Sequence, residues 1–99
     1  MDLRFALIGC GRISPNHIQA ALKNDLTITA FCDLDIDKAK SLMHDCKLTN
    51  EVKIYDDYLK MIEENELDLI AIATDSGSLA KIALDCMRNN INLIIEKPI

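Results

Sequence analysis

Residues 6–14 read Ala-Leu-Ile-Gly-Cys-Gly-Arg-Ile-Ser, an apolar run that meets two glycines and then the start of an amphipathic stretch. Gly9 allows the chain to leave a buried strand in a tight turn that a Cβ would obstruct. Gly11 has no side chain, so an anionic group can approach the backbone N–H groups at the positive end of the following helix. Arg12 and Ile13 open that helix, and Ser14 stands where a small residue is needed for packing against the strand.

A second apolar run, residues 26–32, ends at Asp33. Asp33 follows the glycines by roughly 20 residues, the spacing of a dinucleotide-binding strand–helix–strand unit. In such a unit the carboxylate accepts hydrogen bonds from the adenosine ribose, and it would repel a 2′-phosphate. The sequence therefore favours NAD over NADP as the cofactor, although Lys38 and Lys40 keep NADP as an alternative. The competing interpretation of Asp33 is an ordinary cap or turn residue.

Apolar runs alternate with amphipathic stretches along the rest of the chain. We expect strands at residues 5–8, 26–32, 52–55, 67–73 and 92–96, with a helix between each pair. This alternation predicts an α/β fold, a Rossmann-type doubly wound parallel sheet in the strand order 3-2-1-4-5, with helices on both faces. Ligands of such sheets lie beyond the carboxyl ends of the strands, at the switch point between the first and fourth strands.

Apolar spacing and capping residues predict the details of the helices. The side chains expected to face the sheet are Ile18, Ala21 and Leu22 in the first helix, Ala39, Leu42, Met43 and Cys46 in the second, Leu59 and Ile62 in the third, and Leu79, Ile82, Ala83 and Cys86 in the last. The expected N-caps are Asp35 or Asp37 and Asp56 or Asp57, and the last helix is expected to stop at Asn89-Asn90.

Two polar segments follow the fourth and fifth expected strands. Thr74 and Ser76 belong to the segment across the switch point from Gly9, which makes them candidate cofactor contacts, although helix capping also explains Ser76. Glu96-Lys97-Pro98 directly follows the last apolar run and brings an ammonium group to the same edge of the sheet. Lys97 is therefore the candidate catalytic residue, with Glu96 and Pro98 beside it. The alternative is a solvated tail.

Composition narrows the functional classes. The 99 residues suffice for one domain, and the net charge of −5 without a basic cluster disfavours nucleic acid as a partner. The apolar runs are too short to span a membrane and the first residues are unlike a signal peptide, so we expect a cytoplasmic protein. The four cysteines have no metal-binding spacing, so no metal is expected; they are predicted to be small, buried thiols in a reducing compartment.

The whole chain resembles the N-terminal NAD(P)-binding domain of the Gfo/Idh/MocA family, the glucose–fructose oxidoreductase and inositol dehydrogenase group. The matching segments are residues 8–13, 32–33, 72–74, 76–77 and 95–99. The resemblance implies an NAD(P)-dependent oxidoreductase acting on sugars, cyclitols or their derivatives. The family's Glu-Lys-Pro motif maps onto residues 96–98, which implies that Lys97 contacts the nicotinamide side and the substrate, and that the bond before Pro98 is cis.

Other features of the resemblance concern the branch and the length. The Ser-containing turn and the Thr-x-Ser-Gly loop are similar to nucleotide-sugar dehydrogenases that oxidise UDP-linked acidic amino sugars. Asp75 and Leu79 depart from the family's usual Pro and His, so a loop contact through that His is not expected. Residues 1–99 would form the dinucleotide-binding domain, and the C-terminal substrate domain of the family is absent from this chain. We therefore expect NAD binding without turnover, and a homo-oligomer formed through the absent domain.

Two other interpretations remain open. One is a stand-alone NAD-sensing regulatory module without catalysis, and the other is the Rossmann half of a homoserine- or aspartate-type dehydrogenase. An ammonium group at Lys97 favours the sugar dehydrogenase, because a sensor needs no cation at the nicotinamide end.

Overall fold

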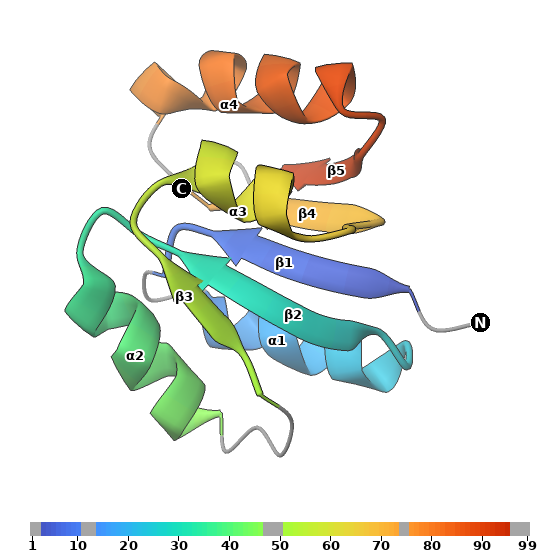
Figure 1. Cartoon of the computed structure of the whole chain (residues 1–99). Coiled ribbons are helices and arrows are strands. Elements are labelled where there is room, and N and C mark those ends of the chain that lie inside the picture. The colour runs from blue at the N-terminus through green and yellow to red at the C-terminus, as the bar shows by residue number, and fades with distance from the viewer. Residues whose placement is uncertain (1–2, 11–13, 47–50, 74–75, 96–99) are drawn as a thin grey trace.

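The computed structural model of the chain describes residues 3–10, 14–46, 51–73 and 76–95 (Figure 1). A parallel sheet of five strands forms the centre, in the order β3-β2-β1-β4-β5. The elements are β1 (Arg4–Ile8), α1 (Ser14–Lys23), β2 (Thr27–Cys32), α2 (Ile36–Asp45), β3 (Lys53–Tyr55), α3 (Tyr58–Glu64), β4 (Leu69–Ile72), α4 (Ser76–Arg88) and β5 (Asn92–Ile95). The predicted fold class and strand order are confirmed.

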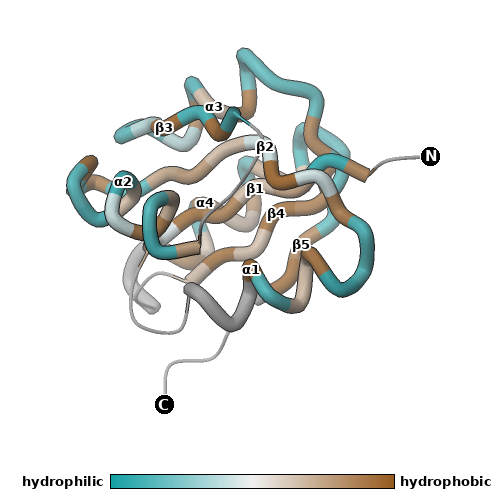
Figure 2. Tube along the Cα trace, turned by 90° about the horizontal axis from the view of Figure 1, so that it is seen from below, coloured by the Kyte–Doolittle hydropathy of each residue, from teal (hydrophilic) through white to brown (hydrophobic). Residues whose placement is uncertain are grey.

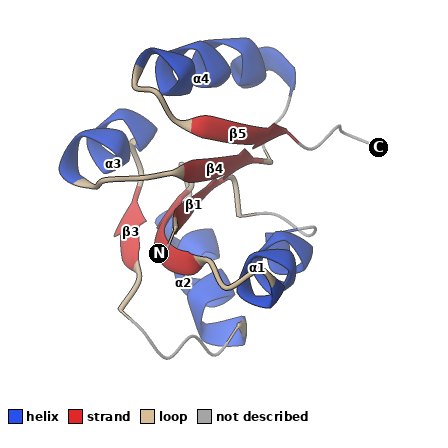
Figure 3. Ribbon diagram, turned by 90° about the vertical axis from the view of Figure 1, so that its right-hand side faces the viewer, coloured by secondary structure: helices blue, strands red, loops and turns tan. Residues whose placement is uncertain are grey.

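Helices cover both faces of the sheet, with α1 and α2 on one side and α3 and α4 on the other (Figures 1 and 3). Successive strand residues point to opposite faces, so each strand contributes to two separate cores. Phe5, Leu7 and Phe31 pack beneath α1 and α2, whereas Ile8 and Ile70 pack beneath α3 and α4. The central strands are accordingly hydrophobic along most of their length, while polar residues lie on the outer turns of the helices (Figure 2).

The helix faces agree with the predicted periodicity except at two leucines. Ile18 and Ala21 are buried, but Leu22 is 41% exposed, so its assignment to the inner face was wrong. In α3 the residues that reach the core are Met61 and Ile62, while Leu59 is 46% exposed. The helix has only seven residues, about two turns, so few of its side chains can face the sheet. The Tyr58 hydroxyl donates a hydrogen bond of 2.5 Å to Asp85, which links α3 to α4.

The capping residues resolve the alternatives that the sequence left open. Asp35 is the N-cap of α2 and accepts a hydrogen bond from the Asp37 N–H, and Asp57 caps α3 through the Leu59 N–H. Asn90 adopts a left-handed conformation with φ 58° after α4, as predicted. Asp25 has the same φ between α1 and β2, which the sequence analysis did not predict.

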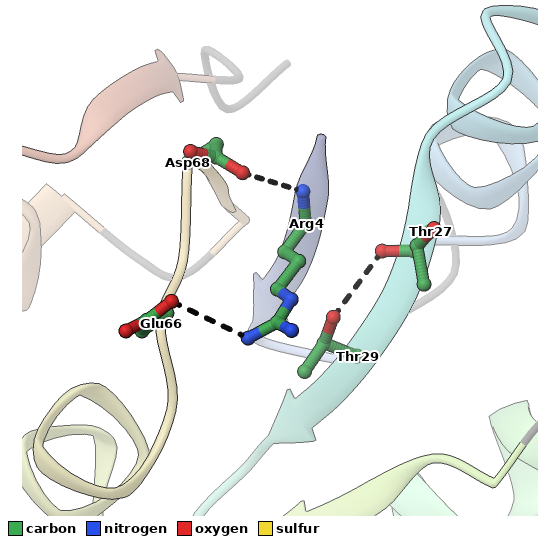
Figure 4. A network of polar contacts seen from close by, with 5 residues as sticks. All are labelled: Arg4, Thr27, Thr29, Glu66 and Asp68. Carbon is green, nitrogen blue, oxygen red and sulfur yellow. Dashed lines mark hydrogen bonds and ion pairs between the residues drawn. The ribbon is translucent and has the colours of Figure 1, made fainter. Parts of the chain in front are cut away.

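The amino ends of the strands form the edge opposite to the glycine turn. Asp68 closes this edge: its N–H donates to the Arg4 carbonyl at 2.9 Å, and its carboxylate accepts from the Arg4 N–H at 2.8 Å (Figure 4). The Arg4 guanidinium lies 3.8 Å from Glu66. An open polar groove of about 500 Å³ lies over these residues. Because parallel sheets bind ligands at the carboxyl edge, this groove is on the wrong side for a dinucleotide.

Candidate cofactor site

The carboxyl ends of β1, β2 and β4 meet at one edge of the sheet. Ile8 lies opposite Cys32 on one side and Ile72 on the other, so the three strands end in register. Beyond these pairs, the Gly9 N–H donates to the Cys32 carbonyl and the Ala73 N–H to the Ile8 carbonyl, both at 2.8 Å. The glycine turn therefore begins at the crossover between the two halves of the sheet, as the sequence predicted.

Gly9 is the point at which the chain turns out of β1. Its φ is 92°, a conformation that residues with a Cβ adopt only at a steric cost. A glycine is therefore required at residue 9, the position at which the sequence predicts the tight turn of a dinucleotide-binding unit. The turn at Gly9 brings the Cys10 N–H to the carboxyl edge of the sheet.

Asp33 lies next to the turn and accepts two backbone hydrogen bonds. The Cys10 N–H donates to Oδ2 at 2.8 Å, and the Asp35 N–H donates to Oδ1 at 2.8 Å. The Asp33 N–H in turn donates to the Tyr55 carbonyl at 3.0 Å, which fixes the backbone of this residue at the end of β3. The half-buried carboxylate is therefore held between the glycine turn and the start of α2.

The surroundings of Asp33 are acidic and open. Asp56 and Asp57 follow β3 next to it, and both are exposed. Leu34, the next residue along the chain, is 93% exposed and carries no cation. Lys38 is exposed on α2, one turn after the Asp35 cap. A phosphate placed at Asp33 would meet several negative charges at once.

Cys10 and Cys32 lie beside Asp33 but are not suited to covalent chemistry. Burial and the charge of Asp33 raise the pKa of the Cys10 thiol to about 12, and burial with nearby aspartates raises that of Cys32 to about 12. Both thiols therefore stay protonated near neutral pH, and the thiolate is the nucleophilic form. Their side chains belong to opposite faces of the sheet, while the Cys10 thiol contacts the Cys32 carbonyl at 3.7 Å. Cys10, Cys32 and Cys86 are buried free thiols, as predicted, and Cys46 is half-buried.

Several predicted site residues cannot be placed. Gly11, Arg12, Ile13, Thr74, Glu96, Lys97 and Pro98 lie outside the described residues. Ser76 is the first residue of α4, at the carboxyl side of β4. Of the predicted contacts, the structure thus brings together Gly9 and Asp33. The sequence analysis missed the Cys10 and Asp35 amides as partners of Asp33, although the Asp-x-Asp spacing was a signal for the second.

Two further properties concern the described part of the chain. Within it, no group of three or more His, Cys, Asp or Glu side chains is arranged to hold a metal ion. Among the same residues, no helix has both the length and the apolar character needed to cross a membrane.

Comparison with known proteins agrees with this geometry. The Gfo/Idh/MocA sequence model, described as an oxidoreductase family with an NAD-binding Rossmann fold, matches residues 3–99. The chain belongs to this family. Inositol 2-dehydrogenase of Salmonella paratyphi B is 25% identical over 101 residues, which cover 100% of this chain and 30% of that protein.

Solved structures of relatives share the fold closely. An oxidoreductase from Agrobacterium radiobacter, solved with NAD+, L-tartaric acid and magnesium, has a TM-score of 0.87 at 25% identity, covering 99% of this chain and 28% of the other. The dehydrogenase WlbA of Chromobacterium violaceum, solved with NADH and UDP-GlcNAcA, has a TM-score of 0.84 at 26% identity, covering 98% and 28%. The Gfo/Idh/MocA chain thus spans between 22% and 30% of the length of the curated relatives it matches.

The residues present fit the NAD-binding role of the family. A Cβ at Gly9 would strain the turn, and the Asp33 carboxylate lies beside that turn with both oxygens accepting backbone N–H groups. The chain therefore has the NAD-binding Rossmann fold of the Gfo/Idh/MocA family.

Proposed function

We propose that the chain is the cofactor-binding half of an NAD-dependent dehydrogenase that oxidises a hydroxyl of a sugar, cyclitol or nucleotide sugar. The observation that carries this proposal is the Asp33 carboxylate, held 2.8 Å from the Cys10 amide beside the glycine turn. It supplies a negatively charged acceptor at the place where a dinucleotide-binding unit recognises the adenosine ribose.

The adenosine and pyrophosphate would be held by the first half of the domain. Gly9 and Gly11 would allow close approach to the backbone, and the amides of Arg12 and Ile13 would bind the pyrophosphate. Asp33 would accept hydrogen bonds from the ribose hydroxyls. The surrounding acids, together with an uncharged Leu34, disfavour the 2′-phosphate of NADP, so NAD is the proposed cofactor.

The nicotinamide end would be held by segments that follow β4 and β5. Thr74 and Ser76 are proposed to contact the cofactor there, and Glu96, Lys97 and Pro98 to border the reacting ring. When bound, the nicotinamide accepts a hydride from a carbinol carbon of the substrate. Lys97 would position the substrate hydroxyl by donating a hydrogen bond, which orients the carbon toward the ring.

The substrate pocket and the general base are proposed to lie in polypeptide beyond this domain. Relatives with more than three times this length include an inositol 2-dehydrogenase and a dehydrogenase solved with UDP-GlcNAcA, which motivates the sugar or nucleotide-sugar substrate. The chain alone would bind NAD without oxidising substrate, and homo-oligomers would form through the additional polypeptide. We place this enzyme in the cytoplasm.

The first test is a titration of the chain with NADH and with NADPH, following nicotinamide fluorescence. Asp33→Ala removes the proposed ribose acceptor, whereas Asp56→Ala removes a neighbouring exposed charge and serves as the matched control. Saturable binding that favours NADH, weakened in Asp33→Ala and little changed in Asp56→Ala, is expected. Tighter binding of NADPH than of NADH would refute the proposed cofactor preference.

A second test separates catalysis from sensing. The assay uses a longer polypeptide that contains this domain, followed by a C-terminal part as long as that of the relatives. Reduction of NAD is measured with inositol and with UDP-GlcNAcA as substrates. Oxidation that is lost in Lys97→Ala but retained in Lys81→Ala supports the dehydrogenase. NADH binding without oxidation of either compound would favour the regulatory module.

A further inference from the structure

We infer that Asp33 is a positioning residue for the glycine turn in addition to its proposed contact with the ribose. This inference rests on the proposed function, because it assumes that the glycine turn binds the pyrophosphate and that Asp33 binds the ribose. A single carboxylate would then couple two parts of the cofactor site.

The first argument is the position of the Cys10 amide. The hydrogen bonds that join β1 to β2 end with the Gly9 N–H, so Cys10 is the first residue of the turn beyond the strand. Cys10 is only 7% exposed, and its N–H is directed to Asp33 Oδ2 at 2.8 Å. A buried amide that loses its acceptor is costly, and an ionised acceptor makes a stronger hydrogen bond than a neutral one. Asp33 therefore stabilises the turn at its first residue.

The second argument is that the carboxylate itself is fixed. Its other oxygen accepts from the Asp35 N–H at 2.8 Å, and Asp35 caps α2 through the Asp37 N–H at 3.0 Å. The Asp33 backbone is held by its bond to the Tyr55 carbonyl. A carboxylate anchored from both sides can hold the turn in place before any ligand arrives.

The third argument concerns the remaining hydrogen-bonding capacity. Each carboxylate oxygen has two acceptor sites, and each accepts one backbone N–H here. Among the contacts of the described residues, one acceptor site per oxygen is left for the two ribose hydroxyls, so ribose binding does not require the contact with Cys10 to break. An amide side chain has one acceptor oxygen, and its NH₂ group would face one of the two backbone N–H groups.

Replacing Asp33 is expected to have a wider effect than the loss of a ribose contact alone. Replacing Asp33 would weaken the binding of the pyrophosphate as well as that of the ribose. A single substitution at Asp33 would then fail to produce a good NADPH-binding protein, because the turn that holds the pyrophosphate is no longer preorganised.

The test uses NADH and an NADH analogue whose adenosine ribose is 2′,3′-dideoxy, so that it offers no hydroxyls to Asp33. If Asp33 positions the turn, Asp33→Ala weakens binding of the analogue about tenfold, the effect of losing one charge-assisted hydrogen bond. Asp33→Asn, which keeps one acceptor, weakens it less, and Asp56→Ala leaves it unchanged. Unchanged analogue binding in Asp33→Ala would overturn the inference.

A second measurement requires no ligand. Amide hydrogen exchange of the cofactor-free chain is followed at Cys10 and at Leu7, which lies within β1. Asp33→Ala is expected to accelerate exchange at Cys10 far more than at Leu7, whereas general destabilisation would accelerate both together. Equal acceleration, or none, would contradict the inference. Failure of the unaltered chain to bind NADH would refute the proposed function instead, and the exchange data would then decide the turn contact alone.

Discussion

Raising the pH above 8 is expected to destabilise this domain through its buried thiols. Burial raises the pKa of Cys10 and Cys32 from 9.0 to about 12, and that of Cys86 to about 11. Above pH 9 the unfolded chain therefore loses protons that the folded chain keeps. Since the unfolded state then binds fewer protons, stability is fully present below pH 8 and falls as the pH rises toward 12.

The size of this loss of stability follows from the pKa of the thiols in the unfolded chain. Between pH 8 and pH 10, a thiol with a pKa of 9.0 goes from mostly protonated to mostly ionised, while the folded thiols remain protonated. Each such thiol costs about 1.4 kcal/mol of unfolding free energy over this range, and three cost about 4 kcal/mol. A domain of this size has a total stability of roughly 5–15 kcal/mol, so the loss is large enough to measure easily.

The assay is urea unfolding at pH 8, 9 and 10 in the presence of a reducing agent, followed by circular dichroism. The double variant Cys10→Ala/Cys32→Ala is expected to lose about 3 kcal/mol less than the unaltered chain between pH 8 and pH 10. Ser41→Ala, at an exposed position without a titrating side chain, serves as the control. An equal loss in the unaltered chain and in the double variant would refute the argument that these thiols are buried and protonated.

Three further substitutions test particular contacts. Gly9→Ala, at φ 92°, should lower the free energy of unfolding by about 1 kcal/mol and weaken NADH binding. An unchanged free energy in urea unfolding and an unchanged NADH affinity would contradict the turn geometry. Tyr58→Phe removes the 2.5 Å hydrogen bond to Asp85 and should cost about 1–2 kcal/mol in urea unfolding, so no loss would mean that the bond contributes nothing. Asn90→Ala should cost about 1 kcal/mol because of its left-handed φ of 58°, whereas Asn90→Gly should not; equal thermal midpoints for the two variants would argue against that conformation.

The sheet order could be predicted because it depends on local patterns and on one handedness rule. Apolar runs such as residues 69–72 are too short for helices and too hydrophobic for a half-exposed strand, so they indicate strands buried on both faces. Right-handed crossovers then leave few possible orders for five parallel strands. Gly9 and Asp33 were found in the same way, from their places directly after two of these runs.

The features that could not be predicted from the sequence depend on contacts between segments that are distant along the chain. The hydrogen bond from Cys10 to Asp33 joins residues that follow two different strands, and neither residue type predicts the other as its partner. Leu22 and Leu59 satisfy a helical pattern but lie on its flank, where packing against neighbouring elements decides burial. The roles proposed for Thr74, Ser76 and residues 96–98 come from their places after the fourth and fifth apolar runs and from the family resemblance.

Chemical-shift mapping of NADH binding to the ¹⁵N-labelled chain tests the central claim most directly. The account predicts saturable shifts of the Gly9, Cys10 and Asp33 amides at the carboxyl edge, with little change at Arg4 and Asp68 on the opposite edge. Shifts concentrated at Arg4 and Asp68, or no shifts at millimolar NADH, would contradict the assignment of the carboxyl edge as the cofactor site.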